Sequence, residues 1–128
     1  MISDQDVVRG ILQAYVDKDR EAIEQLIAKD FHFSSPIDNR IDRDAYFRLC
    51  WPSSENMDDF EIVRMASDRD AVFVTYIGTM GGRRFRNTEV HTLRDGKVVE
   101  VEVYFGWNIP HDVPAGEHAD PKAEPANG

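Results

Sequence analysis

The sequence predicts a single α+β domain, in which three helices from the N-terminal half pack on the concave face of a cone-like curved antiparallel sheet. Apolar residues recur at helical spacing in the first 51 residues, whereas apolar and polar residues alternate from Phe60 onward. Helices that precede an antiparallel meander are typical of the α+β class. Helices fill the hollow of a curved sheet incompletely, so a pocket is expected between the two layers.

Three helices are expected before Pro52. Their expected ranges are 4 to about 17–19, 21–29 and 43 to about 51. Ser3 and Asp42 precede the first and third ranges, and such side chains accept hydrogen bonds from the free backbone N–H groups of a helix start. Pro52 ends the third helix, because the residue before a proline disfavours the helical conformation.

Five strands are expected. A short Phe-rich strand ends at Pro36, which has no N–H to donate to a sheet. Alternation places Phe31, Phe33 and Ser35 on one face of that strand. Residues 53–59 are polar and are expected to form a loop. The remaining strands are expected at 60–67, 71–79, 84–93 and 97 to about 107, with glycine turns at 81–82 and 95–96.

Charge and composition exclude several classes of partner. The formal net charge is −9, which argues against nucleic acid because binding phosphates needs a basic face. The first ten residues lack the basic start and apolar core of a signal peptide, and no apolar run reaches the ~20 residues of a membrane span. The single cysteine, Cys50, fits a reducing compartment. We expect a cytoplasmic protein without nucleic-acid or membrane partners.

The composition changes near the C-terminus. Residues 110–128 are rich in proline, glycine, alanine and charge, with almost nothing to bury, so we expect a domain over 1–109 and a polar tail over 110–128. The four histidines are scattered and no spacing joins three metal ligands, so no metal is expected. The Gly81–Gly82 pair lies in a hairpin and no phosphate-binding loop is present, so no cofactor is expected.

The order of the elements and one hairpin resemble a known superfamily. Residues 94–100 read Arg-Asp-Gly-Lys-Val-Val-Glu, and the strand that they begin continues to Phe105 and Gly106. Together with the helices and the strand that ends at Pro36, this order is similar to the nuclear-transport-factor-2-like superfamily over about residues 4–109. The hairpin resembles the SnoaL-like and ketosteroid-isomerase branches most closely. The resemblance implies a pocket for a small hydrophobic molecule and a homodimer through the convex sheet face.

The resemblance carries over few functional groups. The isomerases place a carboxylate base where this chain has Ser35, and a tyrosine donor where it has Ile11, one turn before Tyr15. Their third group, a carboxylic acid kept protonated in an apolar site, matches Glu89. The SnoaL-like cyclases use an aspartate where this chain has Val103. Glu89 alone keeps an acidic group at a matching position.

Glu89 and His91 form the sharpest candidate pair, because residues two apart on a strand share a face. If that face lines the pocket, a carboxyl beside an imidazole can act as an acid/base pair. Alternatively, the face is solvated or the two groups only satisfy each other. Tyr15 offers a hydroxyl donor or a core ring. Asp38 offers a base near the pocket mouth or simply a turn residue.

Other residues are expected to contact the ligand. We assign this role to Phe33, Ser35, Trp51, Val103 and Trp107. The aromatic residues among them form expected walls, with Trp107 closing the pocket from the sheet end, although core packing also explains such residues.

Two hypotheses on function follow. The first is an isomerase, cyclase or dehydratase without cofactor, which transfers a proton on a hydrophobic carbonyl or hydroxyl compound through Glu89 and His91. The second is a non-catalytic ligand-binding or dimerisation module. It is supported by Ile11, Ser35 and Val103, which occupy positions where the enzymes that the chain resembles carry catalytic residues.

Overall fold

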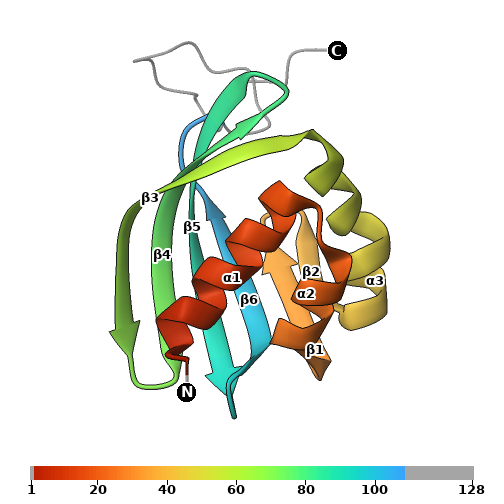
Figure 1. Ribbon diagram of the computed structural model, residues 1–128, viewed down its shortest axis with the longest axis vertical. Coiled ribbons are helices and arrows are strands. Elements are labelled where there is room, and N and C mark those ends of the chain that lie inside the picture. Colours follow the sequence, from red (N-terminus) through yellow and green to blue (C-terminus); the bar gives the residue numbers. More distant parts are fainter. Residues whose placement is uncertain (1, 109–128) are drawn as a thin grey trace, which may run out of the picture.

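The computed structural model describes residues 2–108 and shows a curved six-stranded sheet with three α-helices on its concave side (Figure 1). The helices are α1 (Asp4–Asp17), α2 (Arg20–Leu26) and α3 (Arg43–Leu49), with a 3-10 helix, η1 (Trp51–Asn56). The strands are β1 (Ile27–Ser35), β2 (Asp38–Asp42), β3 (Met57–Asp68), β4 (Ala71–Met80), β5 (Arg83–Arg94) and β6 (Lys97–Phe105). The predicted α+β class is confirmed. The predicted tail, 110–128, lies outside the described residues.

Two of the helix starts are set by the predicted capping residues. The Ser3 hydroxyl accepts a hydrogen bond from the backbone N–H of Asp6 at 3.1 Å. The Asp42 carboxylate accepts one from the backbone N–H of Ala45 at 2.9 Å. Each bond satisfies a donor that has no partner inside its helix. These caps fix where α1 and α3 begin over the sheet.

The strands follow the order β2-β1-β6-β5-β4-β3 across the sheet. Neighbouring strands are antiparallel except β1 and β6, which run parallel. The prediction of a wholly antiparallel sheet is therefore wrong at this pair. Hairpins force an antiparallel direction on the strands that they join, but β1 is joined to α2 and β2, not to β6.

Three local predictions are corrected. Residues 27–29, expected in the second helix, begin β1. A short apolar stretch is compatible with both the helical and the strand repeat of apolar residues, so the pattern alone does not decide between them. Residues 38–42, where only a turn at Asp38 and a helix cap at Asp42 were expected, form the edge strand β2, whose polar side chains show little alternation. Residues 53–56, also expected in a loop, belong to η1, and β3 begins at Met57.

The core lies between the helices and the concave face of the sheet. Its largest fully buried side chains are Val7, Val8, Ile23, Phe31, Val72, Val74, His91 and Val98. The convex face, by contrast, is not covered by any described element (Figure 1). Phe73 and Tyr104 are 41% and 54% exposed. A homodimer through the convex face stays a prediction.

None of the described helices has the length and apolar character that crossing a membrane requires. The cytoplasmic location stays a prediction from the sequence.

Candidate active site

A cavity of about 360 Å³ lies between the helices and the concave face of the sheet. Side chains from both layers of the fold line it, with α1, α3 and η1 on one side and residues of all six strands on the other. Small-molecule sites are typically ~300–1,000 Å³ and mostly apolar. The cavity therefore has the size and character of a ligand site.

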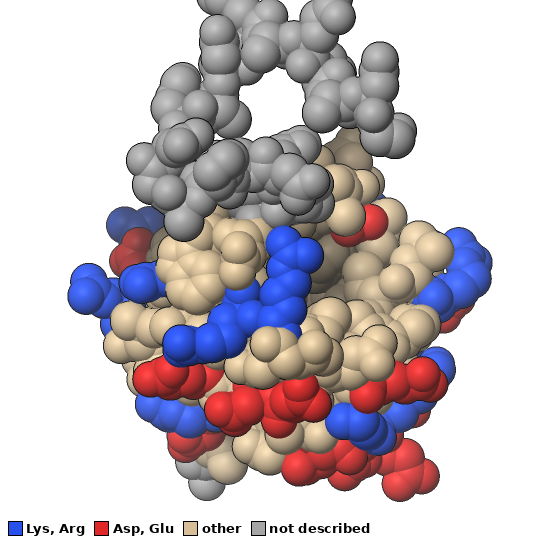
Figure 2. Space-filling view, turned by 90° about the horizontal axis from the view of Figure 1, so that it is seen from above, with Lys and Arg blue, Asp and Glu red and all other residues tan. Residues whose placement is uncertain are grey.

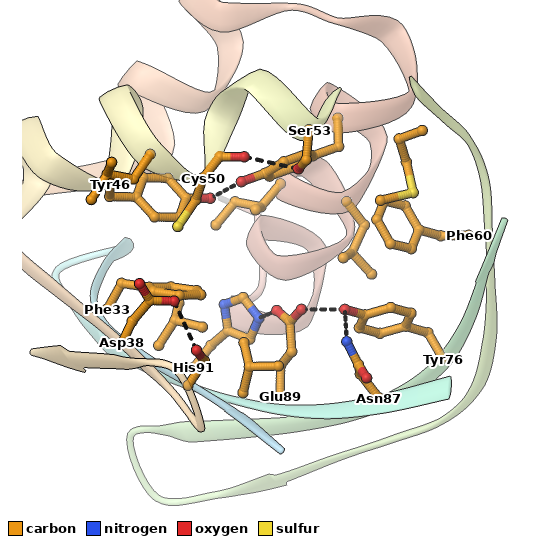
Figure 3. A pocket seen from close by; sticks show the side chains of 18 of the residues that line it. Phe33, Asp38, Tyr46, Cys50, Ser53, Phe60, Tyr76, Asn87, Glu89 and His91 are labelled. Atoms are coloured by element: carbon orange, nitrogen blue, oxygen red, sulfur yellow. Dashed lines mark hydrogen bonds and ion pairs between the residues drawn. The ribbon is translucent and has the colours of Figure 1, made fainter. Parts of the chain in front are cut away.

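The floor of the cavity carries a chain of polar groups (Figure 3). Nε2 of His91 lies 2.9 Å from Oε1 of Glu89, and the two side chains are only 1% and 14% exposed. The Tyr76 hydroxyl donates to Oε2 of Glu89 at 2.5 Å, and the Asn87 amide donates to the Tyr76 hydroxyl at 3.3 Å. Both oxygens of the Glu89 carboxylate are therefore held by donors.

One ring nitrogen of His91 has no hydrogen-bond partner among the described residues. Its Nδ1 is buried and has no hydrogen-bond partner within residues 2–108. When Nε2–H donates to the Glu89 carboxylate, Nδ1 is left as an unprotonated base. A buried polar atom without a partner costs roughly 1–3 kcal/mol. A bound molecule that gives Nδ1 a proton or a hydrogen bond would recover this free energy.

Two tyrosines from the helical layer also line the cavity. The hydroxyls of Tyr15 on α1 and Tyr46 on α3 are hydrogen-bonded to each other. Their rings are held by aromatic neighbours: Trp51 packs 4.9 Å from Tyr15, and Phe31 packs 5.0 Å from Tyr46. Burial raises the pKa of both hydroxyls, and the negative charge of Glu89 adds to the effect. Both hydroxyls therefore stay protonated and able to donate.

The free energy of unfolding is expected to fall steeply above about pH 10. Burial raises the pKa of Tyr15, Tyr46 and Tyr76 in the folded protein. In the unfolded chain these tyrosines ionise near pH 10. Above pH 10 the unfolded chain therefore binds fewer protons than the folded one. The stability contribution of each buried tyrosine is fully present below pH 10, and above it the free energy of unfolding falls by roughly 1.4 kcal/mol for each pH unit and for each such tyrosine.

Urea unfolding at about pH 9 and about pH 11 measures this loss. Tyr46→Phe is expected to decline less steeply than the wild type, because one buried hydroxyl no longer contributes. An equal decline in the two proteins would contradict the assignment.

The mouth of the cavity holds a second polar group. The Ser35 hydroxyl donates to Oδ2 of Asp38 at 2.8 Å and accepts from the backbone N–H of Ile37 at 3.1 Å. Cys50 lines the same cavity. Partial burial, with a smaller contribution from the negative charge of Asp38, raises the pKa of its thiol to about 11. The thiol is therefore neutral near pH 7 and is not set up as a nucleophile.

Most of the residues predicted for the site line the cavity. They are Tyr15, Phe33, Ser35, Asp38, Glu89, His91 and Val103. Trp51 and Trp107 do not line it. Since α3 ends at Leu49, Trp51 begins η1 and packs behind the ring of Tyr15. Trp107 follows the end of β6 and is 43% exposed.

Several polar residues of the cavity were not predicted from the sequence, among them Tyr76, Asn87 and Tyr46. Tyr76 carries a usable signal, because it alternates with the buried Val72 and Val74 along β4. Asn87 lies two residues before Glu89 on β5, so alternation places both side chains on the same face of the sheet. Tyr46 has no such signal, because it lies on the seven-residue α3 beside Phe47, which is also buried.

The floor of the cavity and the helical side opposite it have complementary chemistry. One carries a free imidazole nitrogen backed by a carboxylate, and the other carries a pair of neutral hydroxyls (Figure 3). Such a set can remove a proton from carbon and donate a hydrogen bond to the oxygen that becomes negative. Within residues 2–108, no group of three or more His, Cys, Asp or Glu side chains is arranged to hold a metal ion.

Comparison with known proteins identifies relatives of this fold. The model of the SnoaL-like domain matches residues 8–101. No curated protein sequence matches the chain.

Solved structures also resemble the chain. An NTF2-like protein of unknown function from Cytophaga hutchinsonii has a TM-score of 0.67 and 22% identity, with 83% of this chain and 92% of that one covered. An LEH-like epoxide hydrolase of M. tuberculosis has a TM-score of 0.67 and 20% identity, covering 80% and 82%. IdmH from Streptomyces antibioticus, proposed to be a polyketide cyclase, has a TM-score of 0.64 and 24% identity, covering 80% and 91%. At these identities the likeness shows the fold alone.

Proposed function

The chain belongs to the SnoaL-like family, and on this premise we propose that it binds a small, largely apolar carbonyl compound and transfers a proton on it. The observation that carries the proposal is the buried contact between Glu89 and His91, which leaves Nδ1 of the imidazole without a partner among residues 2–108, in a residue that lines a ligand-sized cavity. An ionisable pair in an apolar cavity is unusual unless it has a chemical task.

The proposed step begins at a carbon next to the carbonyl group. Nδ1 of His91 takes a proton from this carbon, and the electron pair of the broken C–H bond moves toward the carbonyl oxygen to form an enolate. The Glu89 carboxylate stabilises the imidazolium that results. If a C=C bond is conjugated with the enolate, return of the proton from His91 to the far end of this system gives an isomer. Attack of the enolate carbon on a second carbonyl of the same molecule closes a ring, and the resulting alkoxide takes the proton from His91. Loss of a hydroxyl as water gives dehydration.

The negative oxygen of the enolate would be stabilised by Tyr15 and Tyr46. One hydroxyl of the pair donates to the other, so one O–H remains free to donate to a ligand. Donors that are already oriented in a water-excluded site stabilise developing charge more strongly than water does. This arrangement supports a carbonyl oxygen as the group that faces the helical layer.

A second candidate function is a ligand-binding module without catalysis. It is favoured by Ile11, Ser35 and Val103, which line the cavity but provide no ionisable group. In such a module the Glu89–His91 pair would only orient a ligand by hydrogen bonds. The two functions differ in whether a C–H bond is broken.

Exchange of carbon-bound hydrogen with solvent separates them. We expect the wild-type protein to accelerate deuterium uptake from D2O into 2-tetralone, a bicyclic ketone, as followed by NMR. 2-Naphthol, which mimics the enol of this ketone, should bind and suppress the exchange. Binding of 2-naphthol without faster exchange would favour the non-catalytic module, and absence of both would contradict the ligand site.

A further inference from the structure

We propose that the ligand of this cavity carries an anionic oxygen group that binds Arg83, while its apolar body extends inward to Glu89 and His91. The inference rests on the proposed ligand-binding function and adds a substrate class to it: an apolar molecule with a carboxylate, sulfonate or phosphate at one end.

The cavity continues outward into a more open space of about 360 Å³. Five residues line both spaces: Ile37, Met80, Phe85, Asn87 and Phe105. The outer space adds Arg83 and Asn108, next to the turn between β4 and β5. Seen from above, basic side chains border a hollow among uncharged residues at this end of the molecule (Figure 2). The site therefore opens near the start of β5.

A single strand runs from this mouth to the floor. The residues Arg83, Phe85, Asn87, Glu89 and His91 alternate along β5, and all of them line one or both spaces. The glutamate lies six positions after the arginine, which corresponds to roughly 20 Å along a strand. Because the arginine side chain is long and flexible, the ligand body needs to span only part of this distance.

The passage between the two spaces depends on a glycine. Gly78 of β4 lies opposite Phe85, and a Cβ atom at this glycine would come within 2.4 Å of the phenyl ring. The ring therefore lies directly over the backbone of β4, against the sheet. Its face forms an apolar wall between Arg83 and the floor, which suits an apolar ligand body.

Among residues 2–108, Arg83 is the only charged residue that lines the outer space, and it forms no ion pair with any other of them. Its neighbour Arg84, which alternation places on the opposite face, contacts Glu61 at 3.5 Å. A guanidinium presents a planar set of donors that matches an anionic oxygen group, and an apolar surround weakens competition by water. An anionic ligand end fits this position better than a neutral one.

Two fluorescent probes with nearly the same apolar body test the proposal. One is 8-anilinonaphthalene-1-sulfonate and the other is N-phenyl-1-naphthylamine, which lacks the sulfonate. We expect Arg83→Gln to weaken binding of the anionic probe about tenfold and that of the neutral probe less than about twofold. Arg84→Gln is the matched control and should change neither affinity. Added salt should weaken the binding of the anionic probe and leave that of the neutral probe unchanged.

Three results would overturn the proposal. They are an equal effect of Arg83→Gln on both probes, no effect on either, or failure of 2-naphthol to displace the anionic probe. Proton transfer is judged separately, from deuterium uptake into 2-tetralone by the wild-type protein. If the neutral probe binds and the arginine makes no difference, the proposed function stands and the anionic substrate class falls. If neither probe binds the wild type and 2-tetralone exchange is not accelerated, both proposals fail.

Discussion

Replacing Glu89 with glutamine is expected to slow the deuterium exchange of 2-tetralone at least about 100-fold. The glutamine amide can donate to Nε2 of His91, where the carboxylate accepts. The imidazole then carries its proton on Nδ1 and no longer offers a free base at that atom. The variant also loses the negative charge that stabilises the imidazolium.

The shape of the cavity is expected to survive this change. Glutamine has the size of glutamate, and its carbonyl oxygen can still accept from the Tyr76 hydroxyl. Binding of N-phenyl-1-naphthylamine should therefore be retained. Glu102→Gln is the matched control, because Glu102 is exposed and accepts from the Tyr104 hydroxyl at 2.7 Å, away from the cavity. Wild-type exchange by Glu89→Gln would remove the catalytic role.

Truncation of Phe31 is expected to cause the largest loss of stability. This ring is 1% exposed and packs at 5.0 Å against Tyr46. Phe→Ala substitutions in a core cost about 3–5 kcal/mol, because apolar burial is lost and a cavity remains. Natural domains have only roughly 5–15 kcal/mol of stability in total. Phe31→Ala is therefore expected to bring the protein close to unfolding.

Phe73→Ala is the matched comparison for this loss. Phe73 is 41% exposed and belongs to a strand of the same sheet. Its truncation should change the free energy of unfolding by about 1 kcal/mol or less. Urea unfolding of both variants, with the midpoint and slope recorded, measures the difference. Losses of equal size would show that Phe31 does not anchor the core as its burial implies.

The four strands of the meander were predictable because each one carries a local signal. Their residues alternate in polarity, and Asp95 and Gly96 both adopt positive φ, 54° and 78°, which suits a two-residue hairpin turn. By contrast, β2 is a polar edge strand that depends on its pairing with β1. The parallel pairing of β1 with β6 joins distant parts of the chain, so no local sequence pattern indicates it.

The candidate site was predictable where a single strand carries it. Glu89 and His91 share a face by parity alone. The contact of Tyr76 with Glu89 also requires the register of β4 on β5, in which Tyr76 pairs with Asn87. The contact between Tyr15 and Tyr46 depends on how two helices meet over the sheet. Packing of this kind is decided by tertiary structure.

The parallel pair of β1 and β6 has a consequence during protein synthesis. Ile27 pairs with Val98, so β1 must wait for roughly 70 further residues before its partner leaves the ribosome. At about 5–20 residues per second this takes several seconds. During that interval the apolar sides of α1 and β1 have no completed sheet to cover them. A nascent chain therefore reaches its pocket-forming fold only after β6 has been translated.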